Sequence, residues 1–259
     1  MNQSERRLYL IRSLLDENPE TRGCGIPGCA ADQKRLLRGL LNVRPARSAN
    51  PEFLKIQDEY LRQAIAEKGV TDINRLSPIQ PGRYLWQGDI TTLKCDAIVN
   101  AANSGMTGCY APNHDCIDNA IHTFAGVQLR LACAEIMDRQ GCPEPAGRAK
   151  ITPAFNLPCR YVIHTVGPII ANAPTKRDCE LLESCYRACL NLATANNLES
   201  VAFCCISTGE FHFPNEQAAE IAVRTVKSFL HQPTSVKKVI FNVFKEIDKS
   251  IYARLLRAD

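Results

Sequence analysis

From Arg83 onwards, short apolar segments alternate with segments long enough for helices, and this alternation constrains the fold more than any other feature of the sequence. Six segments have the length, apolar character and β-branched or aromatic residues of buried strands: RYLWQG, DAIVNA, RAKIT, RYVIHTV, SVAFCCI and KKVIFNV. Strands that alternate with helices form a mostly parallel sheet with helices on both faces. We therefore predict an α/β fold whose ligand lies outside the carboxyl ends of the strands.

The segments between these strands carry apolar residues at helical spacing. One helix is predicted over residues 117–136, and another over residues 181–192. Two more are expected over about residues 216–230 and about residues 248–256.

Residues 1 to about 78 differ in kind from the rest, because they show helical periodicity without strands. Apolar stripes run through residues 8–15, 36–41 and 53–66, and Gly69 is placed to end the third helix. Connectors that contain Pro, Gly and Asn separate the stripes. We predict a helical extension over residues 1–78 that packs on an α/β domain over residues 79–259.

The charge balance is close to even: 31 Lys and Arg residues stand against 27 Asp and Glu residues, a net charge of +4 that is spread along the chain. A nucleic-acid-binding protein would show a basic stripe or tract, so no nucleic-acid partner is expected. No apolar run reaches the roughly 18 residues of a membrane span, and charges interrupt the first apolar positions too often for a signal peptide. We therefore expect no membrane partner and a cytoplasmic location.

Thirteen cysteines are many, but the number is odd and nothing directs the chain to an oxidising compartment, so a disulfide scaffold is not expected. Most of these thiols are predicted to be small core residues, such as the pair in the apolar run VAFCCI, and Cys185 and Cys189 one helical turn apart. Cys24 and Cys29 lack nearby ligand partners and are interpreted as structural thiols.

One cysteine pair is spaced against a histidine: Cys109, His114 and Cys116 share the loop SGMTGCYAPNHDC, between a strand and a helix. Thiolate and imidazole together suit Zn²⁺, and three protein ligands leave a coordination position for water or substrate, as in catalytic zinc sites. A zinc finger would need four ligands in two pairs, and a cytidine deaminase would need a glutamate where Cys116 stands. From spacing alone, two buried thiols and a surface histidine that lie close by chance explain the pattern equally well.

Loops at three strand ends carry residues that suit a nucleotide. The Asp89 carboxylate could accept a hydrogen bond from an exocyclic amine, and Asn100 and Asn103 could hold ribose hydroxyls. A third loop could point backbone N–H groups at a diphosphate, and it consists of Ser207, Thr208, Gly209, Glu210 and Phe211. Each feature also has a purely structural explanation as a turn, a cap or a connector.

Several motifs occur in the order found in macrodomains, the ADP-ribose-binding α/β/α modules: GDIT, NAANSGMTG, DNAIHTFAG, GRAKIT with YVIHTVGP, and ISTGEFHFPNEQAAEIA. Over about residues 83–256 the chain therefore resembles this family. Where most macrodomain hydrolases have a glycine run, this chain has GCYAPNHDC, which resembles the zinc-containing subclass with a helical N-terminal extension and protein-ADP-ribose hydrolase activity. The resemblance implies a three-layer α/β/α macrodomain, a mixed, mostly parallel six-stranded sheet, and one Zn²⁺ held by Cys109, His114 and Cys116.

By the same resemblance, Asp89 and Ile90 meet the adenine, Asn103 meets the distal ribose, and the backbone of residues 207–211 cradles the diphosphate. Phe244 stands where an aromatic side chain would stack on adenine, although a core phenylalanine fits its strand nearly as well.

Two further residues belong to the helix that follows the Cys/His loop. Asp118 matches an aspartate that positions water in zinc-free relatives, a role that zinc could take over here. His122 resembles the family's helix histidine and is expected to be structural.

The function implied is zinc-dependent hydrolysis of the bond between ADP-ribose and a protein side chain. We expect the distal ribose nearest Zn²⁺, with Asn103 fixing the ribose and Asp118 acting as base or orienter. Two alternatives stay open: a non-catalytic reader of ADP-ribosylation, and an O-acetyl-ADP-ribose deacetylase. The zinc subclass resembles proteins encoded beside a sirtuin-type ADP-ribosyltransferase that modifies a lipoyl-carrier protein, which suggests such a carrier as the partner.

Overall fold

Six strands form one sheet in the computed structural model, which describes residues 1–258. Their bounds are β2 (Arg83–Gln87), β4 (Ala97–Ala101), β5 (Ala149–Pro153), β6 (Tyr161–Thr165), β7 (Ser200–Phe203) and β8 (Lys238–Val243). Their order is β2-β8-β7-β4-β6-β5, and every neighbouring pair is parallel except β5 and β6. The prediction of a mixed, mostly parallel sheet is confirmed, and each predicted segment overlaps one strand.

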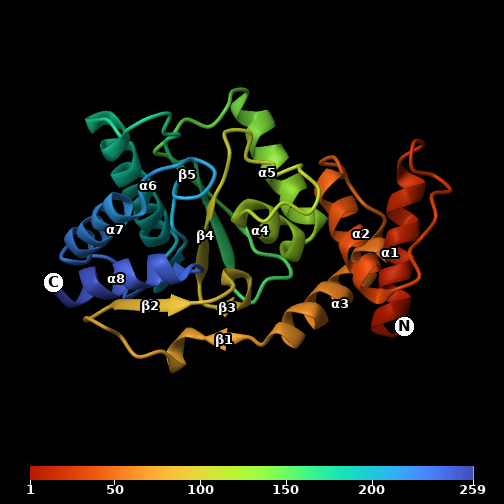
Figure 1. Cartoon of the computed structure of the whole chain (residues 1–259), viewed down its shortest axis with the longest axis horizontal. Helices are drawn as coiled ribbons and strands as arrows, with labels where there is room; N and C mark the ends of the chain where they lie inside the picture. The colour runs from red at the N-terminus through yellow and green to blue at the C-terminus, as the bar shows by residue number, and fades with distance from the viewer. Residues whose placement is uncertain (259) are drawn as a thin grey trace.

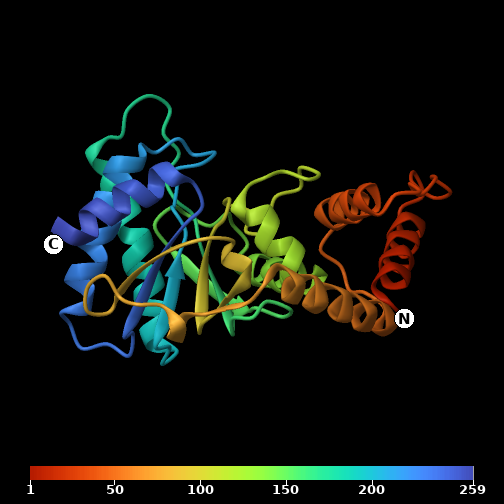
Figure 2. The ribbon, with the colours of Figure 1, turned by 60° about the horizontal axis from the view of Figure 1, so that its bottom comes forward.

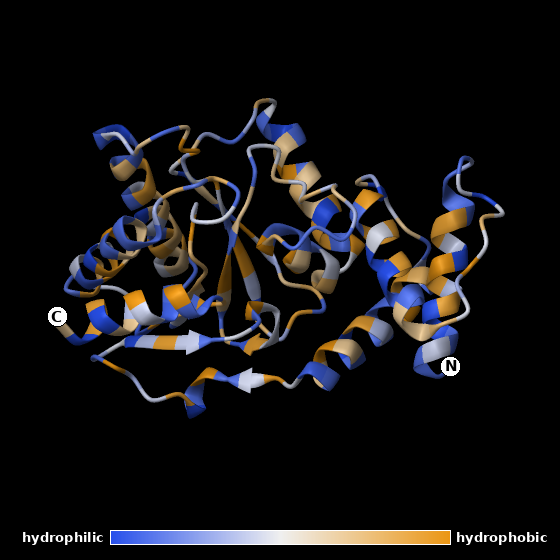
Figure 3. Ribbon diagram, in the orientation of Figure 1, coloured by the Kyte–Doolittle hydropathy of each residue, from blue (hydrophilic) through white to orange (hydrophobic). Residues whose placement is uncertain are grey.

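Helices cover both faces of the sheet, so the domain has three layers (Figures 1 and 2). The helices α4 (Ile117–Ala125) and α5 (Val127–Gln140) lie on one face. The helices α6 (Lys176–Ala195), α7 (Asn215–Leu230) and α8 (Glu246–Ala258) pack side by side on the other. Figure 3 shows hydrophobic and hydrophilic residues alternating along α8, as expected for a helix with one apolar side.

The prediction of a single helix over residues 117–136 is wrong, because the structure has two helices that meet at Gly126. Gly126 has a φ of +96°, a region that residues with side chains rarely adopt, and its N–H donates to His122 O at the end of α4. A Cβ atom at this position would lie 2.7 Å from Gln57 Nε2 and from Gln128 Oε1. Apolar residues continue across the turn because both helices face the sheet, so periodicity did not reveal it.

Three helices precede the sheet and form the N-terminal extension: α1 (Gln3–Glu17), α2 (Ala30–Val43) and α3 (Pro51–Lys68). Asn2 and Asn50 cap α1 and α3 with their side chains, and Gly69 ends α3 as its position predicts. The extension has a hydrophobic cluster of its own, with buried residues that include Leu10, Leu14, Leu37, Phe53 and Leu61. It lies beside α4 and α5, at the end of the molecule opposite the C-terminus (Figure 1).

A short parallel pair connects the extension with the sheet domain. The strand β1 (Thr71–Asp72) pairs with β3 (Leu93–Lys94), and the 3-10 helices η1 (Ile73–Arg75) and η2 (Ile90–Thr92) lie next to them in the chain. Neither strand is apparent in the sequence, because two residues are too few to show an alternating pattern.

The main core lies on both faces of the sheet, and its largest fully buried side chains include Tyr186, Phe203, Phe213 and Phe241. All thirteen cysteines are free, and six of them are buried, among them Cys185, Cys189 and Cys204. Cys29 is exposed and caps α2 with its sulfur atom. Among residues 1–258, no helix combines the length and the hydropathy that a membrane crossing requires.

Candidate functional site

The predicted site residues follow strands at one edge of the sheet, the edge formed by the carboxyl ends of its parallel strands. Asp89 follows β2, Asn103 follows β4, Ser207 follows β7 and Phe244 follows β8. Because these four strands are parallel, their carboxyl ends share that edge. The topology therefore brings together the segments that the sequence predicts to bind one ligand.

Cys109, His114 and Cys116, called here the Cys/His group, lie together in the loop between β4 and α4. Their ligand atoms are all within 4.8 Å of one another, and Cys109 Sγ lies 3.6 Å from His114 Nδ1. All three residues are half-buried. Two sulfurs and one imidazole nitrogen suit Zn²⁺ and leave a position of a tetrahedral shell for another ligand. The group therefore has the geometry and the chemistry to hold a metal ion.

The first turn of α4 fixes the position of Cys116. Its sulfur caps the helix and accepts a hydrogen bond from Asn119 N at 3.4 Å. Burial raises the pKa of the Cys116 thiol to about 12, and the nearby Cys109 and Asp118 act in the same direction. A cation in the group would offset this rise in pKa, because its positive charge stabilises the thiolate, which is the form that binds metals.

A second group with suitable geometry consists of His122, Cys133 and His164, all of them buried. Burial lowers the pKa of His164 to about 3 and that of His122 well below its ordinary value. Both nitrogens of His164 already have partners, since Asn100 Nδ2 lies 3.2 Å from Nδ1 and Thr152 Oγ1 lies 2.9 Å from Nε2. A metal ion would have to displace one of these contacts, so this group fits a metal less well than the Cys/His group.

Asp118 is buried at the start of α4 and is held by two asparagine side chains. Asn100 Nδ2 donates to its Oδ1 atom at 2.8 Å, and Asn103 Nδ2 donates to its Oδ2 atom at 3.3 Å. Burial raises the pKa of Asp118 to about 6, although the hydrogen bond from Asn100 opposes the shift. Asn100 is fully buried and so orients Asp118, whereas Asn103 is half-buried at the edge of the site.

The loop after β7 has backbone N–H groups free to bind a ligand. Within residues 1–258, the N–H groups of Gly209, Glu210 and Phe211 donate to no protein acceptor. Ser207 has a φ of +65°, and its buried Oγ atom has no hydrogen-bond partner among the described residues. Consecutive free N–H groups in a tight loop form the kind of concave site that binds anions.

Glu210 connects this loop with the Cys/His group. Its Oε1 atom lies 3.6 Å from Nε2 of His114, while Nδ1 of the same imidazole faces Cys109. A carboxylate beside Nε2 favours the tautomer with its proton on that nitrogen, which leaves the Nδ1 lone pair for a metal ion. The sequence gives no sign of this contact, because the two residues follow different strands.

At the predicted adenine end, Asp89 already has protein partners. Its Oδ1 atom accepts hydrogen bonds from Thr91, and its Oδ2 atom lies 2.7 Å from Lys68 Nζ of α3. Burial alone would raise the pKa of Asp89, but the bonds to Lys68 and Thr91 outweigh it and lower the pKa. Ile90 is buried, and Phe244 is 76% exposed. The alternative of a core phenylalanine is therefore wrong, and stacking on adenine stays a prediction.

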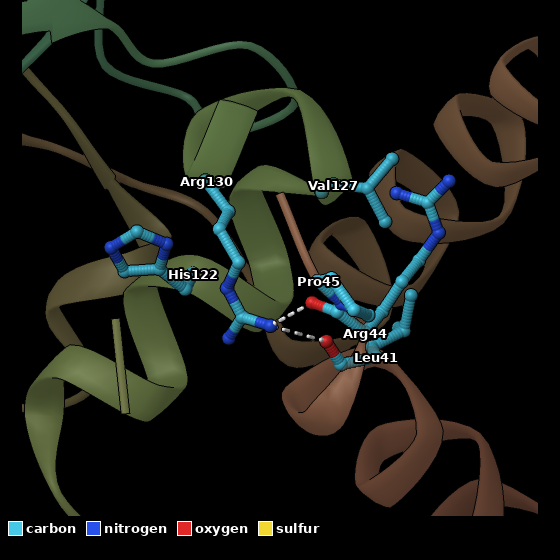
Figure 4. A pocket seen from close by; sticks show the side chains of 7 residues that line it. Leu41, Arg44, Pro45, His122, Val127 and Arg130 are labelled. Carbon is cyan, nitrogen blue, oxygen red and sulfur yellow. Dashed lines mark hydrogen bonds between the residues drawn. The ribbon is translucent and has the colours of Figure 1, made fainter. Parts of the chain in front are cut away.

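A small cavity between α2 and α5 is lined by residues that include Leu41, Arg44, His122, Val127 and Arg130 (Figure 4). Its volume of about 10 Å³ is at most enough for one water molecule, so it is not a nucleotide site. Arg130 donates to the carbonyl oxygens of Leu41 and Arg44, and its Nε atom donates to Thr107 O at 2.8 Å. The buried guanidinium therefore joins the end of α2 to the loop that carries the Cys/His group.

Comparisons with known proteins agree with this fold. Residues 99–222 match the family model of the macro domain. The protein-ADP-ribose hydrolase of Treponema medium is 58% identical over 261 residues, which cover 99% of this chain and 100% of that protein. The protein-ADP-ribose hydrolase of Staphylococcus aureus strain MSSA476 is 51% identical over 253 residues, 97% of this chain and 95% of that protein.

Among solved structures, the macrodomain of Trypanosoma brucei in complex with ADP-ribose has a TM-score of 0.65 and 29% sequence identity, over 84% of this chain and 90% of that chain. The three-layer fold and the relatives that align over nearly the whole chain point to one family. The chain belongs to the protein-ADP-ribose hydrolase family of macrodomains.

Proposed function

We propose that this protein is a zinc-dependent hydrolase that releases ADP-ribose from modified protein side chains. The contact between His114 and Glu210 carries this proposal, because it joins a group suited to Zn²⁺ to a loop suited to a diphosphate. The full-length relatives named as protein-ADP-ribose hydrolases support the same reaction.

The segments at the carboxyl edge of the sheet support one binding mode for ADP-ribose. The free N–H groups of residues 209–211 bind the diphosphate, and the exposed ring of Phe244 stacks on the adenine. Asp89 and the neighbouring Ile90 meet the adenine edge, and Asn103 holds the distal ribose. Because Glu210 contacts the Cys/His group, this order leaves the distal ribose nearest the metal ligands.

The mechanism depends on residues around the distal ribose. Cys109, His114 and Cys116 would hold Zn²⁺, and the ion would supply positive charge beside an oxygen of the distal ribose or of a water molecule. Asn103 fixes the ribose and so places the anomeric carbon. Asp118, oriented by Asn100 and Asn103, accepts a proton from the attacking water. The water oxygen bonds to the anomeric carbon, the bond to the protein side chain breaks, and the proton that Asp118 accepted is returned to that side chain as it leaves.

For the substrate, we propose a lipoyl-carrier protein that a sirtuin-type ADP-ribosyltransferase has modified. Support comes from the resemblance to the zinc-containing subclass. This resemblance extends to the N-terminal extension, because three helices precede the sheet here as well. The test compares an ADP-ribosylated lipoyl carrier with an unrelated protein that bears the same linkage. A clearly higher kcat/KM on the carrier supports this substrate, and equal values contradict it.

The test of the proposed reaction uses Cys109→Ser, with Cys142→Ser as a matched control that changes an exposed cysteine outside the site. Zinc content is measured together with the free ADP-ribose released from a modified protein. We expect Cys109→Ser to lose zinc and turnover but to keep binding ADP-ribose, whereas Cys142→Ser keeps all three properties. Wild-type turnover by Cys109→Ser would contradict zinc dependence.

The same assay distinguishes the two alternative functions. A reader of ADP-ribosylation would bind ADP-ribose tightly and release none from the modified protein. A deacetylase would act faster on O-acetyl-ADP-ribose than on the modified protein.

A further inference from the structure

We propose that Arg38 of α2 is a positioning residue for the metal ligand His114, so that the N-terminal extension holds the Cys/His group in its binding geometry. This role rests on the proposed zinc site and extends it, because it gives the extension a part in metal binding. The contacts of the loop that carries the ligands support it step by step.

This loop has little backbone structure of its own. Within the segment 107–116 of the described chain, one backbone hydrogen bond joins two of its residues, from His114 N to Ala111 O at 3.3 Å. Asn113 has a φ of +57°, which is uncommon for a residue with a side chain. Since its own backbone bonds are so few, the loop depends on other elements to keep one conformation.

Arg38 supplies contacts to the backbone and side chains around two of the ligands. Its Nη2 atom donates to His114 O at 2.8 Å and to Asn119 Oδ1 at 3.0 Å, and its Nε atom donates to the same Oδ1 atom at 3.2 Å. Asn119 in turn donates from Nδ2 to Ala111 O at 3.0 Å and from its backbone N–H to Cys116 Sγ at 3.4 Å. The planar guanidinium therefore ties the backbone of one ligand to the helical turn that positions another.

The next turn of α2 holds the same loop. Asn42 is 1% exposed, its Oδ1 atom accepts from Asn113 N at 2.9 Å, and its Nδ2 atom donates to Thr123 Oγ1 at 2.9 Å. Between these residues Gly39 allows a close approach, because a Cβ atom there would lie 3.1 Å from Asn113 Nδ2. One face of α2 thus contacts the loop through Arg38, Gly39 and Asn42. Arg38 and Asn42 are one helical turn apart, so their side chains lie on the same face.

A positioning role and a merely structural role predict different results. If Arg38 only stabilised the fold, its removal would lower the unfolding temperature and leave zinc affinity unchanged. If it positions His114, its removal lowers zinc affinity, because loss of a partner that orients a metal ligand typically weakens binding about 10- to 100-fold.

The experiment compares Arg38→Met with Arg35→Met, which removes an exposed arginine one turn earlier on the same helix. Zinc affinity of the full-length protein is measured by competition with a chromogenic chelator. ADP-ribose affinity of the metal-free protein is measured by calorimetry. We expect Arg38→Met to bind zinc about 10- to 100-fold more weakly than the wild type, and Arg35→Met to bind zinc as the wild type does. Both variants should bind ADP-ribose with the same affinity. Equal zinc affinities of the two variants would overturn the proposal.

A second variant and a second readout keep the result decisive. Arg38→Lys keeps the charge and most of the side chain, but it lacks the fork that reaches both acceptors. We therefore expect the unfolding temperature of the wild type, and a zinc affinity between those of the wild type and Arg38→Met. Hydrogen exchange over residues 107–116 of the metal-free protein should be faster in Arg38→Met than in Arg35→Met. If the wild type bound no zinc, the proposed function would fail. The exchange rates would still decide the role of Arg38, and equal rates would overturn it.

Discussion

The Oε1 atom of Glu210 lies 3.6 Å from Nε2 of His114, although Glu210 follows β7 and His114 follows β4. The contact places the loop proposed to bind the diphosphate against the group proposed to bind zinc. If one ligand changes the affinity for the other through such a contact, thermodynamic linkage requires the second ligand to change the affinity for the first by the same factor.

Glu210→Gln should weaken the coupling between ADP-ribose and zinc. In the wild type, ADP-ribose bound at residues 209–211 fixes Glu210 and should change zinc affinity by about fivefold or more. In the variant, the neutral amide orients His114 less strongly, so the change should be smaller. The measurement is zinc affinity with and without saturating ADP-ribose in both proteins. An unchanged zinc affinity in the wild type would contradict the coupling.

Asp118→Asn should reduce turnover without reducing nucleotide binding. The amide cannot accept a proton, and its NH₂ group would face the donors of Asn100 or Asn103. We expect kcat to fall by about 100-fold or more, with little change in ADP-ribose affinity. Asp115→Asn is the control, because it removes the charge of an exposed neighbour in the same loop. Similar kcat values for the two variants would exclude Asp118 from the proton transfer.

His164 should make the protein less stable at acid pH. Burial lowers its pKa to about 3 in the folded protein, whereas an unfolded chain has a value of about 6.5. Below pH 6.5 the unfolded state therefore binds a proton that the folded state does not. This difference lowers the free energy of unfolding by about 2 kcal/mol between about pH 7.5 and pH 5.

Comparison with His164→Asn isolates this effect, because Asp118, whose pKa is raised to about 6, acts in the opposite direction in both proteins. Urea unfolding at about pH 7.5 and pH 5 gives the stability difference between wild type and variant, which should shrink by about 2 kcal/mol at the lower pH. A difference that does not change with pH would mean that His164 is not buried in its neutral form.

Gly126→Ala should be more destabilising than Gly141→Ala. Both glycines have positive φ, at +96° and +71°, but a Cβ atom at Gly126 meets Gln57 and Gln128 at 2.7 Å, whereas nothing lies within 4 Å at Gly141. Backbone strain alone should cost about 1 kcal/mol at Gly141, and the added overlap should raise the cost at Gly126 to about 3 kcal/mol. Chemical unfolding measures the loss of stability in both variants. Equal losses would show that Gln57 and Gln128 move aside easily.

The strands and the site loops could be predicted because their signals are local. A strand such as SVAFCCI shows its type in consecutive residues, and the loop after it carries Ser207 and Gly209 directly. Cys109, His114 and Cys116 are close in sequence, but their spacing alone fitted chance proximity as well as a metal site; the structure brings their ligand atoms within 4.8 Å of one another.

The contacts that complete the site could not be predicted, because they join distant segments. Lys68 of α3 pairs with Asp89, and Arg38 of α2 holds His114, but neither basic residue differs in its local sequence from a solvated one. The burial of Asn100 is likewise a property of the sheet, since a strand-end asparagine can face either the ligand or the core. Only the tertiary structure decides between these environments.

The most direct test of zinc-dependent hydrolysis is the release of free ADP-ribose from an ADP-ribosylated protein, followed over time before and after metal removal. The protein is stripped with a chelator, assayed, and assayed again after zinc is added back in equal molar amount. We predict that release stops in the stripped protein and returns with zinc. Full activity in protein shown to contain no zinc would contradict the proposed chemistry.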